Sequence, residues 1–257
     1  MSEGGTPGYY GKLPCLGDFA MRRLPRAFID PWDRWLQKVV ACSREQLGDA
    51  WLDTYLTSPL WRFAFSAGLI GEGAWSGVLM PSADRVGRVF PFAVVAPLPA
   101  YTSPMRVVET GEAWFERAEA VMLAALDDDF TVERLEELLA EVGPPAFDPA
   151  ATGAWPAAGG GRGKLAMHLG LVSIDNFAAI LPELAGRLLH RMTSTHGVWW
   201  TGGSDRVAPS VLITEGLPPV TGFAAFLDGD WSRWGWQEAG APAPPSHSLQ
   251  AGIGRGP

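Results

Sequence analysis

The sequence has few cysteines, few histidines and few charged residues for its length. Its 257 residues include only 2 Cys and 4 His, and charged residues make up 19% of the total. Two cysteines, Cys15 and Cys42, cannot form a disulfide framework, so we expect a reducing compartment. No two histidines have the short helical spacing of a zinc site, and none has a cysteine neighbour. We therefore expect no metal and no cofactor.

The sequence also lacks a membrane-spanning run, a secretion signal and a basic stripe. Its most apolar stretch, 89–101, contains three prolines and is shorter than the roughly 20 residues that a membrane helix needs. The first ten residues have neither the basic nor the apolar region of a signal peptide. The net charge is -8 and the Lys and Arg residues are scattered, which disfavours nucleic acid and anionic membranes as partners. We expect a cytoplasmic protein without direct membrane insertion.

Large apolar residues, in contrast, are abundant. The chain is 47% hydrophobic and contains 12 Trp and 12 Phe, which is typical of a globular protein with an ordinary core and not of a disordered chain. Asp30 followed by Pro31 predicts the start of a helix that runs to Leu47. In 60–66, Trp61, Phe63 and Phe65 alternate with smaller or polar residues, which predicts a strand with one buried face.

The remaining patterns predict alternating helices and strands. Two apolar runs, 74–80 and 89–96, flank the turn-rich sequence PSADRVGR and indicate an antiparallel hairpin with a long loop. Further predicted elements are helices at 49–55, 111–126, 131–142 and 175–191, strands at 198–201 and 210–214, an apolar run at 165–172 and a short element at 223–227.

A segment rich in Gly, Pro and Ala, 143–163, is the best internal boundary of the chain. It divides the sequence into an N-terminal α/β domain at 1–142, a linker or loop at 143–163 and a smaller C-terminal α/β portion at 164–240. We expect the last residues, 241–257, to form a flexible tail.

No complete catalytic constellation is present. The string GGGRGK at 159–164 departs from a phosphate-binding loop, because Ala158 and Leu165 stand where the pattern needs Gly and Ser or Thr. His196 is near Ser194 and Asp205 in the sequence, but the nucleophile motif G-x-S-x-G is absent. We therefore expect that the protein is not an enzyme.

The sequence DWSRWGW at 230–236 holds three of the tryptophans beyond the last clear element. Trp231 and Trp234 either pack in the core or form part of a contact surface, because exposed aromatic residues tend to mark such surfaces. The pattern alone leaves both alternatives open.

Periodicity does not explain two other stretches, GYYGKLPCLGDF at 8–19 and PSADRVGRVFPF at 81–92. In the first, glycines and a proline surround Lys12 and Asp18; in the second, Asp84, Arg85 and Arg88 crowd a turn that contains glycine. These charges either form internal salt bridges that hold loops in place or bind a partner. Both alternatives remain open at this stage.

Together with RAFIDPWDRWL and the aromatic strand WRFAF, these two stretches resemble the TagF (ImpM) family, accessory proteins of bacterial type VI secretion. The resemblance covers residues 8 to about 130. It implies an α/β protein of the α+β type, with a central, mainly antiparallel sheet flanked by helices. It also implies a cytosolic, non-enzymatic regulator that represses assembly of the secretion apparatus after translation by binding its forkhead-associated (FHA) scaffold protein.

Two alternative functions are weighed against regulation by protein binding. One is a nucleotide- or small-ligand-binding switch or a hydrolase with a site near Lys12, Asp84, Arg85 and Arg88, and the other is a structural subunit of the apparatus. As candidate partner-binding residues we take Lys12, Asp18, Phe19, Asp84, Arg85, Arg88, Trp231 and Trp234.

Overall fold

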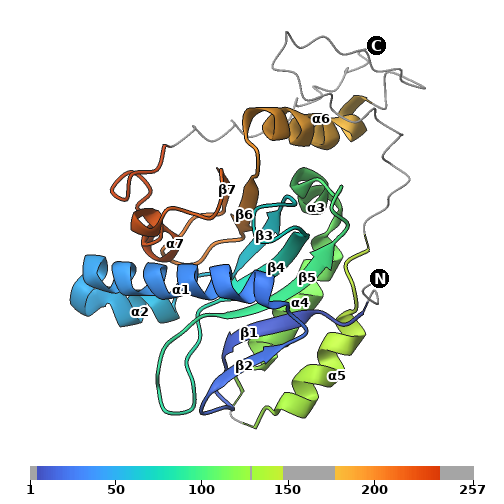
Figure 1. Cartoon of the computed structure of the whole chain (residues 1–257). Coiled ribbons are helices and arrows are strands. Elements are labelled where there is room, and N and C mark those ends of the chain that lie inside the picture. Colours follow the sequence, from blue (N-terminus) through green and yellow to red (C-terminus); the bar gives the residue numbers. More distant parts are fainter. Residues whose placement is uncertain (1–4, 128, 147–176, 238–257) are drawn as a thin grey trace, which may run out of the picture.

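A single antiparallel sheet organises the molecule. The computed structural model describes residues 5–127, 129–146 and 177–237. Within them, seven strands form one sheet in the order β2-β1-β5-β4-β3-β6-β7, and every neighbouring pair is antiparallel (Figure 1). The expected α+β fold with a central antiparallel sheet is therefore confirmed. The strands are β1 (Gly8–Lys12), β2 (Phe19–Arg22), β3 (Trp61–Phe65), β4 (Ala74–Met80), β5 (Phe92–Leu98), β6 (Gly197–Thr201) and β7 (Ser210–Thr214).

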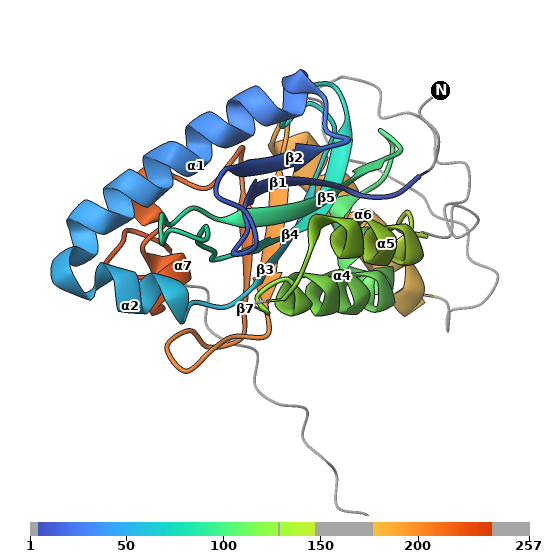
Figure 2. The ribbon, with the colours of Figure 1, turned by 90° about the horizontal axis from the view of Figure 1, so that it is seen from below.

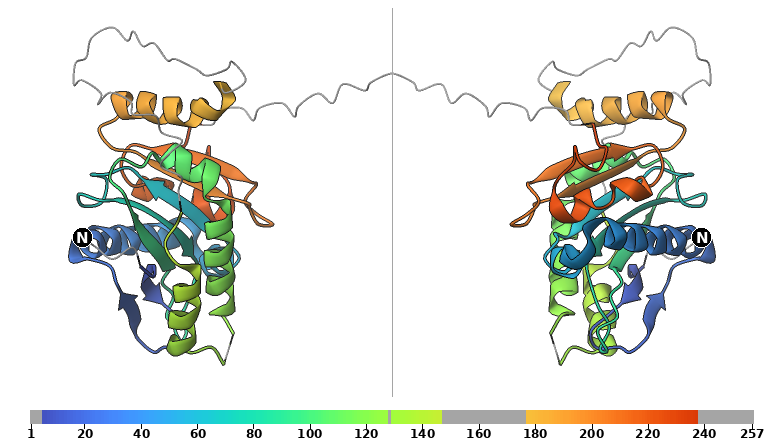
Figure 3. Two further views of the ribbon diagram at one scale, coloured as in Figure 1. Left: turned by 90° about the vertical axis from the view of Figure 1, so that its right-hand side faces the viewer. Right: turned by 90° about the vertical axis from the view of Figure 1, so that its left-hand side faces the viewer.

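Helices cover both faces of the sheet (Figure 2). One face packs against α1 (Arg26–Leu47), α2 (Trp51–Leu56) and α7 (Ala225–Asp228), together with the short 3₁₀ turns Gly48–Ala50 and Val220–Gly222. The other face packs against α3 (Pro104–Thr110), α4 (Glu112–Ala124) and α5 (Val132–Val142). A further helix, α6 (Phe177–Met192), lies next to α3 beyond the end of the sheet (Figure 3).

The two faces bury different kinds of side chain. On the α1 side, Phe28, Trp32, Phe63 and Trp199 belong to a core made largely of aromatic rings, and the rings of Trp32 and Phe63 are 5.2 Å apart. On the α4 side the core is mostly aliphatic, with residues such as Val94 and Met122. The predicted alternation in β3 is confirmed, because Trp61, Phe63 and Phe65 face the α1 side and Ala64 faces the other. One strand thus supplies both cores.

The predicted hairpin at 74–96 is present, but its second strand is displaced towards the C-terminus and ends at Leu98. Strands β4 and β5 pair from Ala74↔Leu98 to Met80↔Phe92. The second strand begins at Phe92 instead of Val89, and Val89 makes only an isolated bridge with Ala83. Pro91 has no backbone N–H to donate to a ladder, so the residues before Phe92 belong to the loop.

Helix α1 begins five residues earlier than the sequence predicts. Its first residue is Arg26, and Pro31 lies inside the helix instead of at its start. Phe28, in the added turn, is fully buried, and its ring centroid lies 4.7 Å from that of Trp75. We attribute the earlier start to this burial, which outweighs the single backbone hydrogen bond that Pro31 cannot donate.

The C-terminal portion contributes to the same sheet as the N-terminal region. Strand β6 pairs with β3, and β7 pairs with β6, as the antiparallel register Phe63↔Trp199 and Trp199↔Leu212 shows. The predicted strands at 198–201 and 210–214 and the helix at 175–191 are present as β6, β7 and α6. Most of the predicted linker, the apolar run at 165–172 and the predicted tail at 241–257 lie outside the described residues.

Within residues 5–127, 129–146 and 177–237, no helix has the length and apolar character that a membrane span requires.

Candidate functional site

The two stretches that periodicity left unexplained lie side by side in the structure. Residues 8–22 form the β1–β2 hairpin, and residues 81–91 form the loop between β4 and β5. The two are joined directly, since the Arg85 N–H donates to the Leu16 carbonyl at 3.0 Å and the Arg88 guanidinium donates to the Gly17 carbonyl. We call this unit the hairpin-loop region.

Part of the hairpin-loop region was expected to be loop and is strand instead. Strand β1 has the sequence GYYGK and is buried throughout. Gly11 has φ of 137°, and a Cβ atom there would lie 2.0 Å from the Pro91 carbonyl oxygen. Glycine therefore allows β1 to approach the start of β5 closely. The two glycines of GYYGK hide the strand from a pattern-based prediction, because they break the alternation of side chains.

The inner half of the hairpin-loop region is a buried ion-pair network centred on Asp84. The Asp84 side chain is fully buried, and its Oδ2 accepts from Lys12 Nζ at 2.8 Å and from Arg88 Nε at 2.7 Å. Its Oδ1 accepts from the backbone N–H groups of Val86 and Arg88 at 3.1 and 2.8 Å. Burial raises the pKa of Asp84, but these donors outweigh that effect and hold the pKa below its usual range. Asp84 is therefore a carboxylate that organises its own loop.

Helix α2 also anchors this loop, through the hydroxyl of Tyr55. The Tyr55 hydroxyl accepts from the Ser82 N–H at 3.1 Å and donates to the Ser82 carbonyl at 3.3 Å, and Ser82 Oγ donates to the Lys12 carbonyl at 2.8 Å. Burial raises the pKa of Tyr55, so its hydroxyl stays protonated and can donate. These bonds tie β1, α2 and the loop together. We call Lys12, Ser82 and Asp84 the inner half and include with them Tyr55 of α2, because its hydroxyl is bonded to Ser82.

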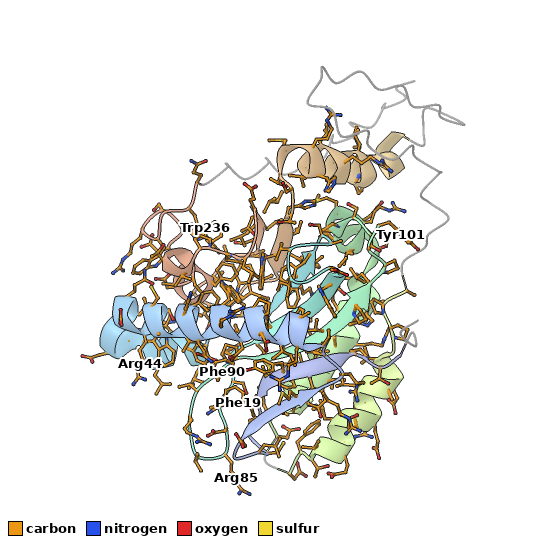
Figure 4. The ribbon with its side chains drawn as sticks, in the orientation of Figure 1. Phe19, Arg44, Arg85, Phe90, Tyr101 and Trp236 are labelled. Carbon is orange, nitrogen blue, oxygen red and sulfur yellow. The ribbon has the colours of Figure 1, made fainter. Side chains whose placement is uncertain are left out.

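The outer half of the hairpin-loop region is exposed and combines apolar with basic side chains. Phe19, Met21 and Val86 are 41, 60 and 67% exposed, and Arg85 and Arg88 are also exposed. The Phe19 ring packs edge-to-face on Phe90 at 4.9 Å, and Arg85 points away from the molecule at the outer end of the loop (Figure 4). Large apolar side chains that remain exposed beside charges are typical of a contact surface. The outer half is defined as Phe19, Met21, Arg85, Val86 and Arg88.

The candidate residues in this region thus separate into two groups. Lys12 and Asp84 bind one another and are buried, and Arg88 contributes to their ion pair while its side chain remains 59% exposed. Phe19 and Arg85 are exposed, and no ion pair of Arg85 is found within the described residues. Asp18 is exposed and accepts a hydrogen bond from the adjacent Phe19 N–H at 2.8 Å.

Sequence reasoning missed several residues of the hairpin-loop region. Tyr55 and Ser82 belong to the inner half and Met21 and Val86 to the outer half, but none was a candidate. A usable signal existed for Val86, an apolar residue inside the charged turn DRVGR. The part played by Tyr55 depends on the packing of α2 against the loop, which no local pattern reports.

The tryptophan candidates lie beside α7, away from the hairpin-loop region. Trp231 is half-buried, with its ring centroid 5.9 Å from Phe226 and 6.0 Å from Trp61. Trp234 Nε1 donates to Asp228 at 2.8 Å, and the Arg233 guanidinium lies 4.5 Å from the Trp234 ring. Figure 4 places the neighbouring Trp236 on the other side of α1 from Phe19 and Arg85. The structure does not bring these tryptophans together with the hairpin-loop region.

His196 does not form a hydrolytic set with its sequence neighbours. Its ring is buried, and within the described residues neither ring nitrogen has a hydrogen-bond partner, whereas Ser194 and Asp205 are exposed. Only its backbone is bonded, to Ser66, whose hydroxyl accepts from the His196 N–H at 2.9 Å. Burial, followed by the charge of His190, lowers the pKa of His196. A buried neutral imidazole explains these observations.

One comparison with known proteins names a family, and another finds a solved structure that is similar along most of the chain. A family model described as the TagF N-terminal domain, type VI secretion system-associated, matches residues 8–142, which include the whole hairpin-loop region. The chain is also similar to PA0076 from Pseudomonas aeruginosa PAO1, a solved structure, with 36% identity and a TM-score of 0.74. That alignment covers 93% of this chain and 100% of the other. A search of curated proteins found no match.

Proposed function

Because the chain belongs to the TagF family of type VI secretion-associated proteins, we propose that it is a cytosolic, non-enzymatic regulator of that apparatus. In this proposal it represses assembly of the apparatus after translation by binding the FHA scaffold protein. Family membership supports the pathway. The regulatory mechanism and the partner are the part that we propose.

The observation that carries this proposal is the division of the hairpin-loop region into a rigid inner half and an exposed outer half. The inner half holds the loop in place by ion pairs and hydrogen bonds. Asp84 Oδ2, for example, accepts from both Lys12 and Arg88. The outer half presents Phe19, Val86 and Arg85 on this fixed frame. A preorganised apolar and basic surface favours binding of another protein, because little side-chain and loop entropy is lost on association.

The same geometry bears on the switch or hydrolase hypothesis near Lys12 and Asp84. In that hypothesis Lys12 Nζ would bind a ligand phosphate and the Asp84 carboxylate would act as the base of a hydrolase. Both groups instead bind each other at 2.8 Å and are buried. No specific observation favours this second function over protein binding.

The proposal is tested in cells that produce both proteins. We expect the tagged chain to retain the FHA scaffold protein on affinity purification, and deletion of its gene to increase secretion. If the scaffold is not retained and secretion is unchanged by the deletion, the proposed function is wrong. If the chain is found at fixed stoichiometry in the assembled apparatus, it is a structural subunit instead.

A further inference from the structure

Strand β2 forms one edge of the sheet and leaves one side open. It pairs with β1 from Tyr9↔Arg22 to Lys12↔Phe19, and no other described strand pairs with it. The backbone N–H and C=O groups of an edge strand are a ready template for another extended chain. β2 therefore offers a partner main-chain hydrogen bonds that only a polypeptide can use fully.

Apolar side chains line one face of this edge. Phe19 and Met21 alternate with Ala20, so they lie on the same face of β2, and both are exposed. Phe19 packs on Phe90 and Tyr10, with ring centroids 4.9 and 5.9 Å apart, which fixes its position. A strand added to β2 would cover Met21 and the open side of Phe19. An apolar residue at every second position of the added strand would fit this face.

The charge along the edge is opposite to that of the whole chain. Stretches 8–26 and 81–90 hold six Lys or Arg residues and only two Asp residues, whereas the whole chain has a net charge of -8. Arg22 is 60% exposed and lies 3.7 Å from Glu136, a carboxylate that also pairs with Arg23. Arg85 has no ion pair among the described residues. These cations favour an acidic partner by charge complementarity.

The other edge of the sheet provides the internal comparison. Strand β7 also exposes two large apolar side chains on one face, Val211 at 65% and Ile213 at 49%, but its sequence SVLIT contains no charge. The two edges thus share exposed apolar residues and differ in basic side chains.

From this difference, and resting on the proposed function of partner binding, we propose that β2 and the outer half bind an acidic, extended segment of the partner protein. The segment adds to β2 as a further antiparallel or parallel strand. Its apolar residues contact Phe19 and Met21, and its carboxylates pair with Arg22 and Arg85. Lipid and nucleic acid also carry negative charge, but neither has backbone groups that complete a sheet.

The probe is a synthetic peptide of about ten residues in which Glu and Val alternate. Its matched control has Lys in place of Glu, and the full-length protein is titrated with both. We expect the acidic peptide to bind and the basic peptide not to bind. Raising the salt from about 50 mM to about 500 mM should weaken binding by about tenfold or more, because screening acts on exposed charges. Hydrogen exchange at the amides of 19–22 should slow when the acidic peptide is bound.

Three variants locate the site. Arg22→Glu combined with Arg85→Glu reverses the charge and should weaken binding of the acidic peptide by about tenfold or more. Arg22→Lys combined with Arg85→Lys keeps the charge and should change the affinity for the acidic peptide by less than about threefold. Ile213→Glu places a charge on the β7 edge and should leave binding unchanged. Melting temperatures of all three variants report whether each remains folded.

The outcomes separate this inference from the proposed function. Absence of peptide binding while the scaffold protein still co-purifies overturns the inference and leaves the function standing. Binding of the acidic peptide without retention of the scaffold supports the inference and overturns the function. Equal effects of Ile213→Glu and of the charge-reversal variant contradict β2 as the site. The inference is also overturned if the protein binds phosphatidylserine vesicles or single-stranded DNA in preference to the acidic peptide.

Discussion

Asp84 and Arg85 are adjacent in the chain but lie in opposite environments. The Asp84 side chain is fully buried and accepts four hydrogen bonds, whereas Arg85 is exposed and points away from the molecule. The same contrast holds for the whole hairpin-loop region, where the inner half joins β1, α2 and the loop and the outer half faces outward. A short stretch of sequence can therefore hold a loop in place and present an exposed surface at the same time, through neighbouring residues.

The largest expected effect compares two glycines of the hairpin. Gly11→Ala places a Cβ atom against the Pro91 carbonyl at a φ of 137°, and we expect a loss of about 3 kcal/mol in the free energy of unfolding. Gly17→Ala is the matched control, since nothing lies within 4 Å of the Cβ position there. Urea denaturation of both variants measures the difference. Similar losses in the two variants would contradict the close approach of β1 and β5.

A second comparison removes one hydroxyl from the inner half. Tyr55→Phe leaves the buried Ser82 N–H without its acceptor, and we expect a loss of about 1–3 kcal/mol in the free energy of unfolding. Tyr101→Phe is the control, because Tyr101 is 76% exposed. Thermal unfolding distinguishes them. A Tyr55→Phe variant as stable as Tyr101→Phe would show that α2 does not anchor the loop.

A third, pH-dependent comparison uses the two aspartates of the region. Because the folded state holds the pKa of Asp84 low, the unfolded state takes up the proton first as the pH falls. The contribution of Asp84 to stability is thus complete above its unfolded pKa of about 4 and is lost progressively below it. Asp84→Asn should therefore be less stable than the native chain at pH 5, and the difference should shrink towards pH 3.

Urea midpoints at about pH 5 and about pH 3 measure this effect. Asp18→Asn serves as the control, because Asp18 is exposed and has no ion pair among the described residues. A stability difference between Asp84→Asn and the native chain that stays constant over this range would rule out the ion pair as its source.

The smallest expected effect concerns the outer half. Arg85→Ala removes an exposed side chain with no ion pair in the described part of the chain, so we expect the free energy of unfolding to change by less than about 0.5 kcal/mol. Differential scanning calorimetry of Arg85→Ala and the native chain measures this change in stability. A clear loss of stability would show that Arg85 helps to hold the loop in place, as the inner half does, and would argue against a contact surface at Arg85.

Much of the fold could be predicted from local patterns. The alternation in 60–66 predicted β3 with the correct buried face, because each face of a half-buried strand contacts a different environment. The predicted helix at 131–142 is present as α5, and the Thr131 side chain caps its start by accepting from the Arg134 N–H at 3.2 Å. Helix α3 was missed because it is only seven residues long, although Pro104 at its first position was a signal.

The candidate site was predicted only in part. Charges in a turn that contains glycine singled out Asp84, Arg85 and Arg88 as candidates, and the structure places all three in the loop between β4 and β5. Their separation into buried and exposed groups could not be predicted, since it depends on where Lys12 lies, 72 positions earlier in the chain. The exposure of Met21 could not be predicted from the sequence either. It depends on β2 lying at the edge of the sheet, and an edge strand and a central strand can have the same sequence.

The sequence by itself determined the family, the order of most helices and strands, and the two stretches in which the candidate site lies. These properties depend on local spacing and composition, which the chain carries in any conformation. Only the tertiary structure decided that GYYGK is a strand, that β6 and β7 join the sheet beside β3, and that Asp84 faces inward while Arg85 faces outward. The physical reason is that burial and ion pairing depend on contacts between distant segments, which form only when the chain folds.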